Sequence, residues 1–238
     1  MNERTALVTG ANKGIGKHIA RLLAAEGLTV YAGSRDPGRG RRAVEEIGAG
    51  ARLLVLDVSD PEGIAQAAAQ VDRLDVLVNN AGVSLSLDPP AGTGVEEFRR
   101  TYETNVFGVV AVTNAFPPAL RRSPRPRIVN VSSGTASLTW STNPNPQFTP
   151  GNGGAAAYRS SKAALNALTV LYAQTLADDG FKVNALAPGL RATDLTPGAA
   201  AAGGDPAEAA RGALRLALLR DDGTTGGFFS WDETPVPW

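Results

Sequence analysis

Short apolar runs alternate with amphipathic stretches along the whole chain. Seven apolar runs predict β-strands, at residues 5–10, 28–34, 52–58, 75–82, 127–133, 181–189 and 226–232. Several of these runs are apolar almost throughout, which is typical of parallel strands covered by helices on both faces. The stretches between them predict helices near residues 15–26, 60–71, 94–120, 158–178 and 205–220. The alternation indicates an α/β fold in which a parallel sheet lies between two layers of helices.

The segment 134–157 interrupts this alternation. It is rich in Pro, Gly and Asn and contains two large aromatic residues, Trp140 and Phe148. This composition favours a folded surface loop over another helix. Loops of this length are usually functional or mobile, so we expect an extended loop with a role of its own.

The composition narrows the class of protein. A chain of 238 residues, 43% hydrophobic and 19% charged, favours one large domain over residues 1–238 rather than two. Lys plus Arg and Asp plus Glu number 23 each, so no overall charge attracts nucleic acid or an anionic membrane. With no cysteine and one histidine, His18, the sequence predicts neither a disulfide scaffold nor a metal centre. No stretch approaches the roughly 20 apolar residues of a membrane span, and no apolar signal region opens the sequence, so we expect a cytoplasmic protein.

Three glycines, Gly10, Gly14 and Gly16, stand between the first predicted strand and the first predicted helix. A glycine turn lets a phosphate approach the backbone, and a helix N-terminus offers free amides, so a pyrophosphate could bind here. The spacing differs from G-x-G-x-x-G, and a tight turn without a ligand is the alternative. Two further polar motifs, 79–82 and 131–133, follow the fourth and fifth strands. Because ligands bind at the carboxyl ends of parallel strands, the three motifs together predict one cleft.

The motifs along the chain resemble those of one family. In order they are T-G-x-x-x-G-I-G from Thr9, Asp57-Val58, Asn79-Asn80-Ala81-Gly82, Asn105, Ser133, Tyr158 with Lys162, and Pro188-Gly189 with Thr193. On these residues the chain resembles the short-chain dehydrogenase/reductase family, of the compact Tyr-x-x-x-Lys type and its carbonyl-reductase-like branch. The resemblance implies a Rossmann-type, doubly wound three-layer sandwich around a seven-stranded parallel sheet, in a single domain. It also implies an oxidoreductase with a nicotinamide cofactor.

By this resemblance, the cofactor would contact the glycine turn and the ends of several strands. The residues assigned to cofactor binding are Gly10, Asn12, Lys13, Gly14, Ile15, Gly16, Ser34, Arg35, Asp57, Val58, Asn80, Ala81, Gly82, Tyr158, Lys162, Pro188, Gly189 and Thr193. Among them, Asp57 would contact the adenine and Thr193 would reach the nicotinamide amide.

The end of the second strand indicates which nicotinamide cofactor binds. NAD-dependent relatives carry a carboxylate there for the ribose 2′-hydroxyl, whereas this sequence has Ser34 and Arg35. A guanidinium binds a 2′-phosphate through paired hydrogen bonds, and Lys13 could add a second positive charge. The sequence therefore favours NADPH/NADP+ over NADH. Asp36 is the opposing feature, because it could pair with Arg35 or turn towards the ribose.

Tyr158 and Lys162 lie four residues apart on a predicted helix and therefore share one face. The ammonium of Lys162 is expected to lower the pKa of Tyr158 from its usual value of about 10, as is an oxidised nicotinamide ring. Tyr158 could then donate a proton to a carbonyl oxygen or remove one from an alcohol. By the resemblance, Ser133 would stabilise the reacting oxygen, Lys162 would also hold the nicotinamide ribose, and Asn105 would support a water chain to solvent.

The sequence thus predicts an NADPH-dependent oxidoreductase that reduces a ketone or aldehyde, with Tyr158 as general acid. Two alternatives stay open: the same machinery working as an alcohol dehydrogenase, and a cofactor-sensing regulator without turnover. All the catalytic residues are retained, which disfavours the regulator. Trp140 and Phe148 are candidates for the substrate pocket or, alternatively, for anchors of their loop. The expected partner is a small-molecule carbonyl or alcohol, with no nucleic acid and no membrane.

The oligomeric state is predicted from the segment 134–157. Many members of the family form dimers or tetramers by packing two long helices, here near 94–120 and 158–178, against symmetry mates. In some carbonyl reductases a long insertion before the active tyrosine covers this face and leaves a monomer. The segment 134–157 is longer than is usual in the family, so a monomer is slightly favoured over a homodimer or homotetramer. Trp140 or Phe148 would then lie over the helix surface or the pocket mouth.

Overall fold

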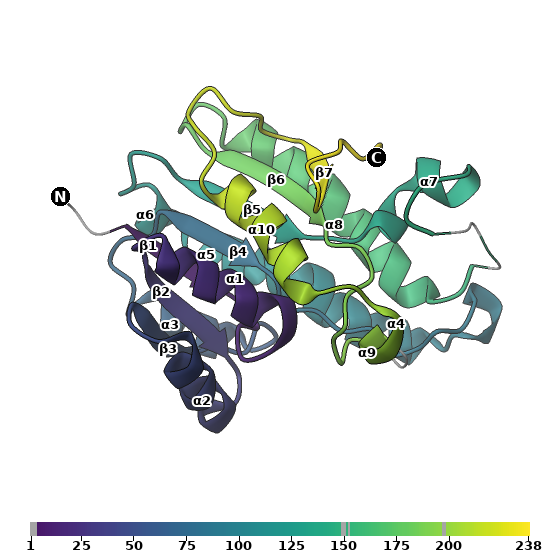
Figure 1. Cartoon of the computed structure of the whole chain (residues 1–238), viewed down its shortest axis with the longest axis horizontal. Helices are drawn as coiled ribbons and strands as arrows, with labels where there is room; N and C mark the ends of the chain where they lie inside the picture. The colour runs from purple at the N-terminus through teal and green to yellow at the C-terminus, as the bar shows by residue number, and fades with distance from the viewer. Residues whose placement is uncertain (1–3, 149–150, 152, 197–198) are drawn as a thin grey trace.

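The computed structural model describes residues 4–148, 151, 153–196 and 199–238. Among these residues, seven parallel strands form one sheet in the order β3-β2-β1-β4-β5-β6-β7 (Figure 1). The strands are β1 (Thr5–Val8), β2 (Thr29–Ser34), β3 (Ala51–Val55), β4 (Val76–Asn79), β5 (Arg127–Val131), β6 (Lys182–Ala187) and β7 (Phe228–Ser230). The strand order reverses between β1 and β4, which is the mark of a doubly wound sheet. The predicted fold class is confirmed.

Helices cover both faces of the sheet (Figure 1). One layer contains α1 (Gly14–Ala25), α2 (Pro37–Ile47) and α10 (Pro206–Ala217), and the other contains α3 (Pro61–Ala68), α5 (Gly108–Ala115), α6 (Pro117–Leu120) and α8 (Ala156–Thr175). The remaining helical elements are η1 (Pro90–Gly92), α4 (Val95–Tyr102), the π turn η2 (Glu103–Phe107), η3 (Gly134–Ala136), α7 (Leu138–Thr142) and α9 (Ala199–Ala202). Each layer buries its own apolar cluster against the sheet. Strands such as β4 are therefore buried along their whole length, as the apolar runs predicted.

Helix α2 was not predicted from the sequence. The carboxylate of Asp36 accepts a hydrogen bond from the backbone N–H of Arg39 at 2.9 Å and caps the helix, which ends at Gly48 with a φ of +94°. Gly38 and Gly40 in the first turns lower the helix propensity, so the sequence pattern did not predict this helix. One of them, Gly40, lies against β2, where an added Cβ would be 3.0 Å from the Cβ of Ser34. Tertiary packing thus outweighs propensity here.

The predicted helix over 94–120 is interrupted in the structure. It consists of α4, the π turn η2 and α5, followed by the separate short helix α6. The break falls at Phe116, directly before Pro117, whose ring restricts the preceding residue and removes a backbone donor. The π turn widens the helix around Asn105.

The segment 134–157 also contains a short helix, α7, which the sequence did not predict. The Ser137 hydroxyl accepts a hydrogen bond from the backbone N–H of Trp140 at 3.1 Å and caps this helix. Trp140 is 7% exposed and packs in a cluster with Phe228 and Val236. The carbonyl of Trp238 accepts from the backbone N–H of Thr139 at 3.3 Å. The segment is therefore fixed to β7 and the residues after it, at the end of the sheet seen on the right of Figure 1.

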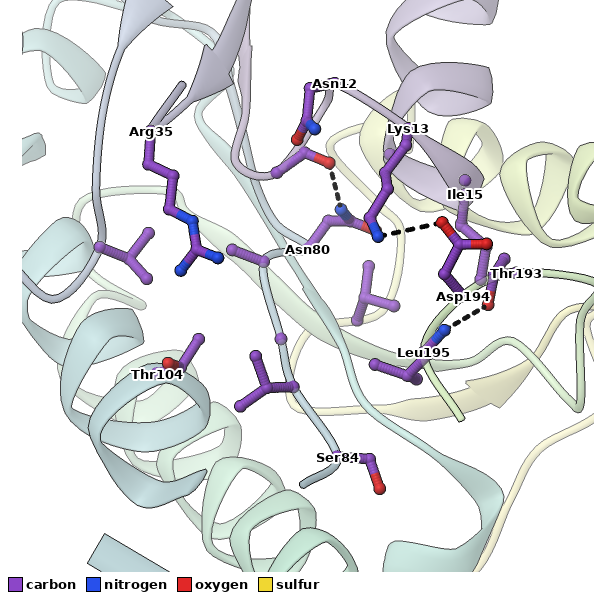
Figure 2. Close-up of a pocket in the computed structure, with 18 of the residues that line it drawn as sticks. Asn12, Lys13, Ile15, Arg35, Asn80, Ser84, Thr104, Thr193, Asp194 and Leu195 are labelled. Atoms are coloured by element: carbon purple, nitrogen blue, oxygen red, sulfur yellow. Dashed lines mark hydrogen bonds and ion pairs between the residues drawn. The ribbon is translucent and has the colours of Figure 1, made fainter. Parts of the chain in front are cut away.

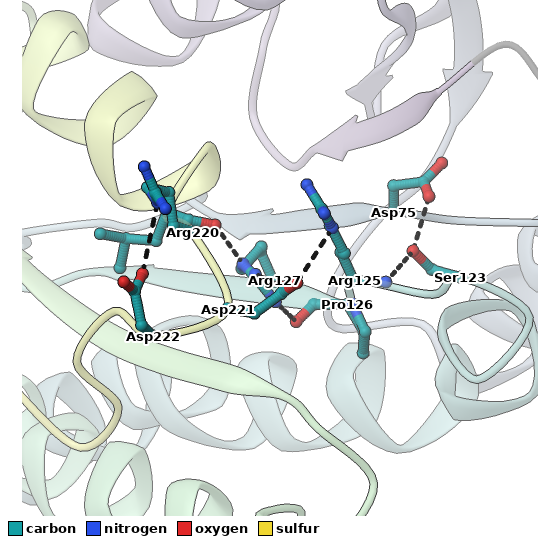
Figure 3. A network of polar contacts seen from close by, with 9 residues as sticks. Asp75, Ser123, Arg125, Pro126, Arg127, Arg220, Asp221 and Asp222 are labelled. Atoms are coloured by element: carbon teal, nitrogen blue, oxygen red, sulfur yellow. Dashed lines mark hydrogen bonds and ion pairs between the residues drawn. The ribbon is translucent and has the colours of Figure 1, made fainter. Parts of the chain in front are cut away.

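At the amino-terminal ends of the strands, two buried charged side chains, Arg127 and Asp75, make polar contacts (Figure 3). The guanidinium of Arg127, 2% exposed, lies 2.8 Å from the carboxylate of Asp221 and donates to the Leu219 carbonyl at 2.9 Å. The buried carboxylate of Asp75 accepts from the Ser123 hydroxyl at 2.6 Å. These contacts connect the amino-terminal ends of β4 and β5 to the chain that follows α10. No helix in the described part of the chain is long and apolar enough to cross a membrane.

Candidate active site

The carboxyl ends of the central strands open into a cavity of about 500 Å³ (Figure 2). The residues predicted for cofactor binding that line it are Gly10, Asn12, Lys13, Gly14, Ile15, Gly16, Ser34, Arg35, Asp57, Val58, Asn80, Ala81, Gly82, Tyr158, Lys162, Pro188 and Thr193. They come from the turn after β1, the ends of β2 and β4, the chain after β3, helix α8 and the segment after β6. A parallel sheet brings these separate sequence motifs to one edge.

The turn after β1 brings its backbone close to the cavity. Gly10 has a φ of +64°, and a Cβ there would lie 3.0 Å from the Cα of Ala81. Asn80 donates from Nδ2 to the Thr9 carbonyl at 2.9 Å, and the Thr9 hydroxyl accepts from the backbone N–H groups of Asn80 and Ala81 at 2.9 and 3.0 Å. A side chain at Gly16 would collide with Asn80. The result is a cradle of backbone before the N-terminus of α1, which fits the pyrophosphate of a dinucleotide.

Arg35 follows β2 and points into the cavity (Figure 2). Within the described ranges its guanidinium forms no hydrogen bond or ion pair, and it acts on Asp57 only through its charge. Asp36 is engaged elsewhere, because its carboxylate caps α2 and lies 3.5 Å from Nε of Arg39. Burial raises the pKa of Asp57, but hydrogen bonds from the Ser59 backbone and hydroxyl outweigh it and hold the pKa below its usual value. Asp36 does not pair with Arg35, but it lines the same cavity, so its turn towards the ribose stays a prediction.

Lys13 has an ionic partner across the cavity. Its Nζ lies 3.1 Å from the carboxylate of Asp194, in the segment after β6 (Figure 2). Both side chains are more than half exposed, so this pair is weak and a phosphate could replace the carboxylate. Gly189 is the predicted cofactor residue that does not line the cavity. It has a φ of +70° and lies against the ring of Trp231.

Three of the four predicted catalytic side chains, those of Ser133, Tyr158 and Lys162, come together where β5 ends; Asn105 is the fourth. Tyr158 and Lys162 lie one turn apart on α8, and the Ser133 hydroxyl lies close enough to the Tyr158 hydroxyl to lower its pKa in part. Nζ of Lys162 lies 5.8 Å from the centre of the Tyr158 ring and donates to the Val131 carbonyl at 2.8 Å. Ser133 is not itself on the cavity wall, and Tyr158 connects it to the cavity.

The expected lowering of the Tyr158 pKa is wrong for the chain on its own. Burial raises the pKa of Tyr158 to about 12, and the Ser133 hydroxyl lowers it only in part. Burial also lowers the pKa of Lys162 to about 8. Both shifts favour the neutral form of a desolvated group. The sequence showed the spacing of the two residues but not their surroundings: Lys162 is buried, and Tyr158 is half-buried on the cavity wall.

Asn105 is fully buried on the π turn between α4 and α5. Its Oδ1 accepts from the Val83 backbone N–H, and its Nδ2 donates to the Val83 carbonyl and the Ser161 hydroxyl, all at 2.9 Å. A Cβ at Gly82 would lie 3.2 Å from this Oδ1 and 3.4 Å from Nζ of Lys162. Asn105 therefore fixes the chain after β4 beside the lysine. Its role in a water chain stays a prediction.

Trp140 and Phe148 do not line the cavity. Trp140 packs in the cluster against β6 and β7, and Phe148 packs on the same cluster with the guanidinium of Arg159 5.8 Å from its ring centre. The structure thus places both as anchors of their segment rather than on the cavity wall, and Phe148 lies beside Arg159 at the start of α8. Farther along the two long helices, Phe107 and Leu171 are each 55% exposed.

Several residues that line the cavity were not predicted. They are Arg39, Leu56, Val83, Ser84, Leu85, Thr104, Ala192, Asp194 and Leu195, whereas Val131 and Ser132 belong to the predicted motif at 131–133. Extending the motif at 79–82 by three residues would have found 83–85. Arg39 could not be placed at the cavity from the sequence, because it lies on α2, a helix that the sequence pattern did not predict. Oγ of Ser84 is buried and has no hydrogen-bond partner among the residues described, so it offers a donor to a ligand (Figure 2). The same residues hold no cluster of three or more His, Asp or Glu that could bind a metal ion.

The chain matches known proteins over nearly its whole length. A protein family described as short chain dehydrogenase matches residues 4–202. The chain belongs to this family. Salutaridine reductase from Papaver bracteatum is 33% identical over 299 aligned positions, which cover 97% of this chain and 95% of the relative. Cyclopentanol dehydrogenase from Comamonas sp. (strain NCIMB 9872) is 38% identical over 203 positions, covering 82% of this chain and 76% of the relative.

A solved structure of an NADPH-bound carbonyl reductase from chicken fatty liver matches this short-chain dehydrogenase with a TM-score of 0.82 and 26% identity, over 100% of both chains. The family predicted from the sequence motifs is confirmed. The chain is therefore an oxidoreductase that acts on CH–OH or C=O groups with a nicotinamide cofactor. Its relatives include enzymes named as reductases and as dehydrogenases.

Proposed function

We propose that this short-chain dehydrogenase is an NADPH-dependent reductase that converts a ketone or aldehyde to an alcohol. The observation that carries the proposal is that one cavity is lined by Tyr158 and Lys162, with Ser133 beside Tyr158, and by the free guanidinium of Arg35. The backbone cradle before α1 lines the same cavity and fits a dinucleotide.

Tyr158 would act as the general acid. Because burial raises its pKa to about 12, its hydroxyl carries a proton at neutral pH and can donate it from Oη to a carbonyl oxygen. The Ser133 hydroxyl would donate a hydrogen bond to the same oxygen and stabilise its developing charge. The cofactor, when bound, supplies the hydride. The ammonium of Lys162, held by the Val131 carbonyl, would favour the phenolate that Tyr158 leaves behind.

The preference for NADPH rests on charges at the end of β2. Arg35 has no partner in the described part of the chain, and the neighbouring carboxylate in the sequence, Asp36, is engaged in capping α2. A 2′-phosphate would therefore meet a guanidinium rather than a carboxylate. The chicken carbonyl reductase that the chain resembles is described as NADPH-bound. NADH is the less favoured cofactor.

Replacing Tyr158 with Phe tests the proposal. Turnover, measured as NADPH absorbance over a panel of ketones and aldehydes and repeated with NADH, should fall about 100-fold or more, because the proton donor is lost. NADPH binding should stay nearly unchanged. Tyr172→Phe is the matched control, since this tyrosine lies on the same helix and, among the described residues, its hydroxyl donates only to Asn114, at 2.9 Å. Unchanged turnover in Tyr158→Phe would refute the assignment, whereas turnover only with alcohol and NADP+ would favour the oxidative alternative.

The assembly is a separate proposal. The monomer predicted from the sequence rested on a segment that covers the two long helices; the described part of that segment packs on β6 and β7 and contacts α8 through Arg159. Phe107 and Leu171 are exposed apolar residues farther along the two long helices. Sedimentation equilibrium at micromolar concentration decides between a monomer and a dimer or tetramer.

A further inference from the structure

The surroundings of the Ser133 hydroxyl contain a second hydroxyl that the mechanism above does not use. Oγ1 of Thr135 lies 2.8 Å from Oγ of Ser133, and the backbone N–H of Thr135 donates to the same Oγ at 3.3 Å. Within the described part of the chain, Oγ1 of Thr135 forms no other hydrogen bond. The Ser133 hydroxyl also lies close to that of Tyr158. Ser133 thus stands between Thr135 on one side and the reacting groups on the other.

The number of protons on these groups limits how the hydrogen bonds can run. A serine hydroxyl has one proton to donate and two lone pairs with which to accept. The backbone N–H of Thr135 already occupies one lone pair of Ser133. If the Thr135 hydroxyl donates to the second, Ser133 has only its proton left, and this must point away from Thr135, towards Tyr158 and the reacting oxygen. If the Thr135 hydroxyl accepts instead, the Ser133 proton points at Thr135 and cannot be donated to the reacting oxygen.

We propose that Thr135 is a positioning residue that donates its hydroxyl proton to Ser133 and so directs the single Ser133 proton at the reacting oxygen. The inference deepens the proposed reductase function and rests on it. Thr135 does not touch the substrate in this scheme, because it acts through Ser133. Nothing in the motif at 131–133 extends to this residue, so the family pattern alone does not point to it.

The turn that carries Thr135 is held firmly enough for this role. Thr135 lies in the 3₁₀ turn η3, which Ser133 caps. A side chain at Gly134, between the two hydroxyls, would collide with Oε1 of Gln147 and lie 3.1 Å from Cζ3 of Trp140. Gln147 in turn donates to the Ser230 hydroxyl on β7 at 2.7 Å. Trp140 and Gln147 of the segment 134–157 therefore pack against the turn after the catalytic serine and hold it in place, and neither residue lines the cavity.

Three variants test the inference. Thr135→Val removes the hydroxyl but keeps the branched shape, and we expect kcat to fall about three- to tenfold, as for the loss of one hydrogen bond. The KM for NADPH should change less than twofold. Thr135→Ser keeps a hydroxyl and should restore at least half of the wild-type kcat. Thr142→Val is the matched control, because among the described residues this exposed threonine bonds only to the Leu138 and Thr139 carbonyls and to the Asn143 amide, away from Ser133.

A double-mutant cycle shows whether Thr135 acts through Ser133. In a Ser133→Ala background, Thr135→Val should cost nothing further, because the group it directs is absent. An equal loss in both backgrounds would overturn the inference. So would a wild-type kcat in Thr135→Val, or a Thr135→Ser variant as impaired as Thr135→Val, which would show a structural role.

A titration without substrate separates this inference from the proposed function. In the NADP+ complex, ultraviolet difference absorption reports ionisation of Tyr158, with Tyr158→Phe as the blank. If Thr135 directs the Ser133 proton to the phenolate, Thr135→Val should move this ionisation to higher pH. An unchanged titration refutes the role of Thr135 even if no carbonyl substrate is found. If no ketone or aldehyde of the panel is reduced, but Tyr158 still ionises at higher pH in Thr135→Val than in the wild type, the proposed reductase function is refuted and the role of Thr135 is supported.

Discussion

Replacing Arg35 with Ala tests the cofactor preference at the residue that carries it. The guanidinium points into the cavity and has no partner among the described residues, so its removal breaks no internal contact. A unit charge 4 Å away contributes about 1 kcal/mol in water and about 4 kcal/mol near a protein surface. A net charge-assisted hydrogen bond contributes about 1.5–3 kcal/mol, within that range. The dissociation constant for NADPH should therefore rise roughly 10- to 150-fold.

The same change should leave NADH nearly unaffected, because NADH lacks the 2′-phosphate. Fluorescence titration of both cofactors in wild type and variant measures the two effects side by side. Arg39→Ala is the matched control, since this side chain lines the same cavity but lies 3.5 Å from the Asp36 carboxylate. It should weaken NADPH binding less than Arg35→Ala. Equal losses for NADPH and NADH would show that Arg35 supports the loop and does not read the phosphate.

Three further outcomes follow from the geometry. Gly82→Ala should lower kcat about tenfold or more with little change in melting temperature, because its Cβ would crowd the Asn105 amide and the Lys162 ammonium. Arg127→Met should lower the free energy of unfolding in urea by about 1–3 kcal/mol and leave kcat unchanged, because it breaks buried contacts far from the cavity. Burial raises the pKa of Asp75, but hydrogen bonds from Ser123 and Arg73 outweigh it and hold the pKa below its usual value. The contribution of Asp75 to the free energy of unfolding is therefore present above the usual pKa of about 4 and is lost as the pH falls through the folded-state pKa. Urea unfolding should show that Asp75→Asn loses less stability in acid than the wild type does.

The sheet and the cofactor end could be predicted from the sequence because they depend on local patterns. Buried parallel strands leave uninterrupted apolar runs, and a turn such as that at Gly10 needs glycine wherever it occurs. The motif at 79–82 follows a strand, so its place at the sheet edge followed from the fold. These features need no knowledge of what packs against them.

The rest depends on contacts between distant segments, which periodicity does not show. Helix α2 forms despite Gly40, because that glycine fits closely against β2. Trp140 could have lined a pocket or anchored a loop, and only the cluster with Phe228 and Val236 decides between them. The direction of the Tyr158 pKa shift likewise depends on burial, whereas the spacing to Lys162 suggested only the opposing charge effect.

The polar contacts of Arg127 and Asp75 lie at the amino-terminal ends of the strands, and the cavity lies at their carboxyl ends. The residues that stabilise the sheet are thus separate from the residues that line the active site. Active sites often limit how far a protein can be stabilised, because their strain or openness serves the reaction. In this enzyme the two requirements fall on separate surfaces. A programme of thermal stabilisation could therefore work on the Arg127 edge, and a search for new substrates on the cavity edge, with little interference between them.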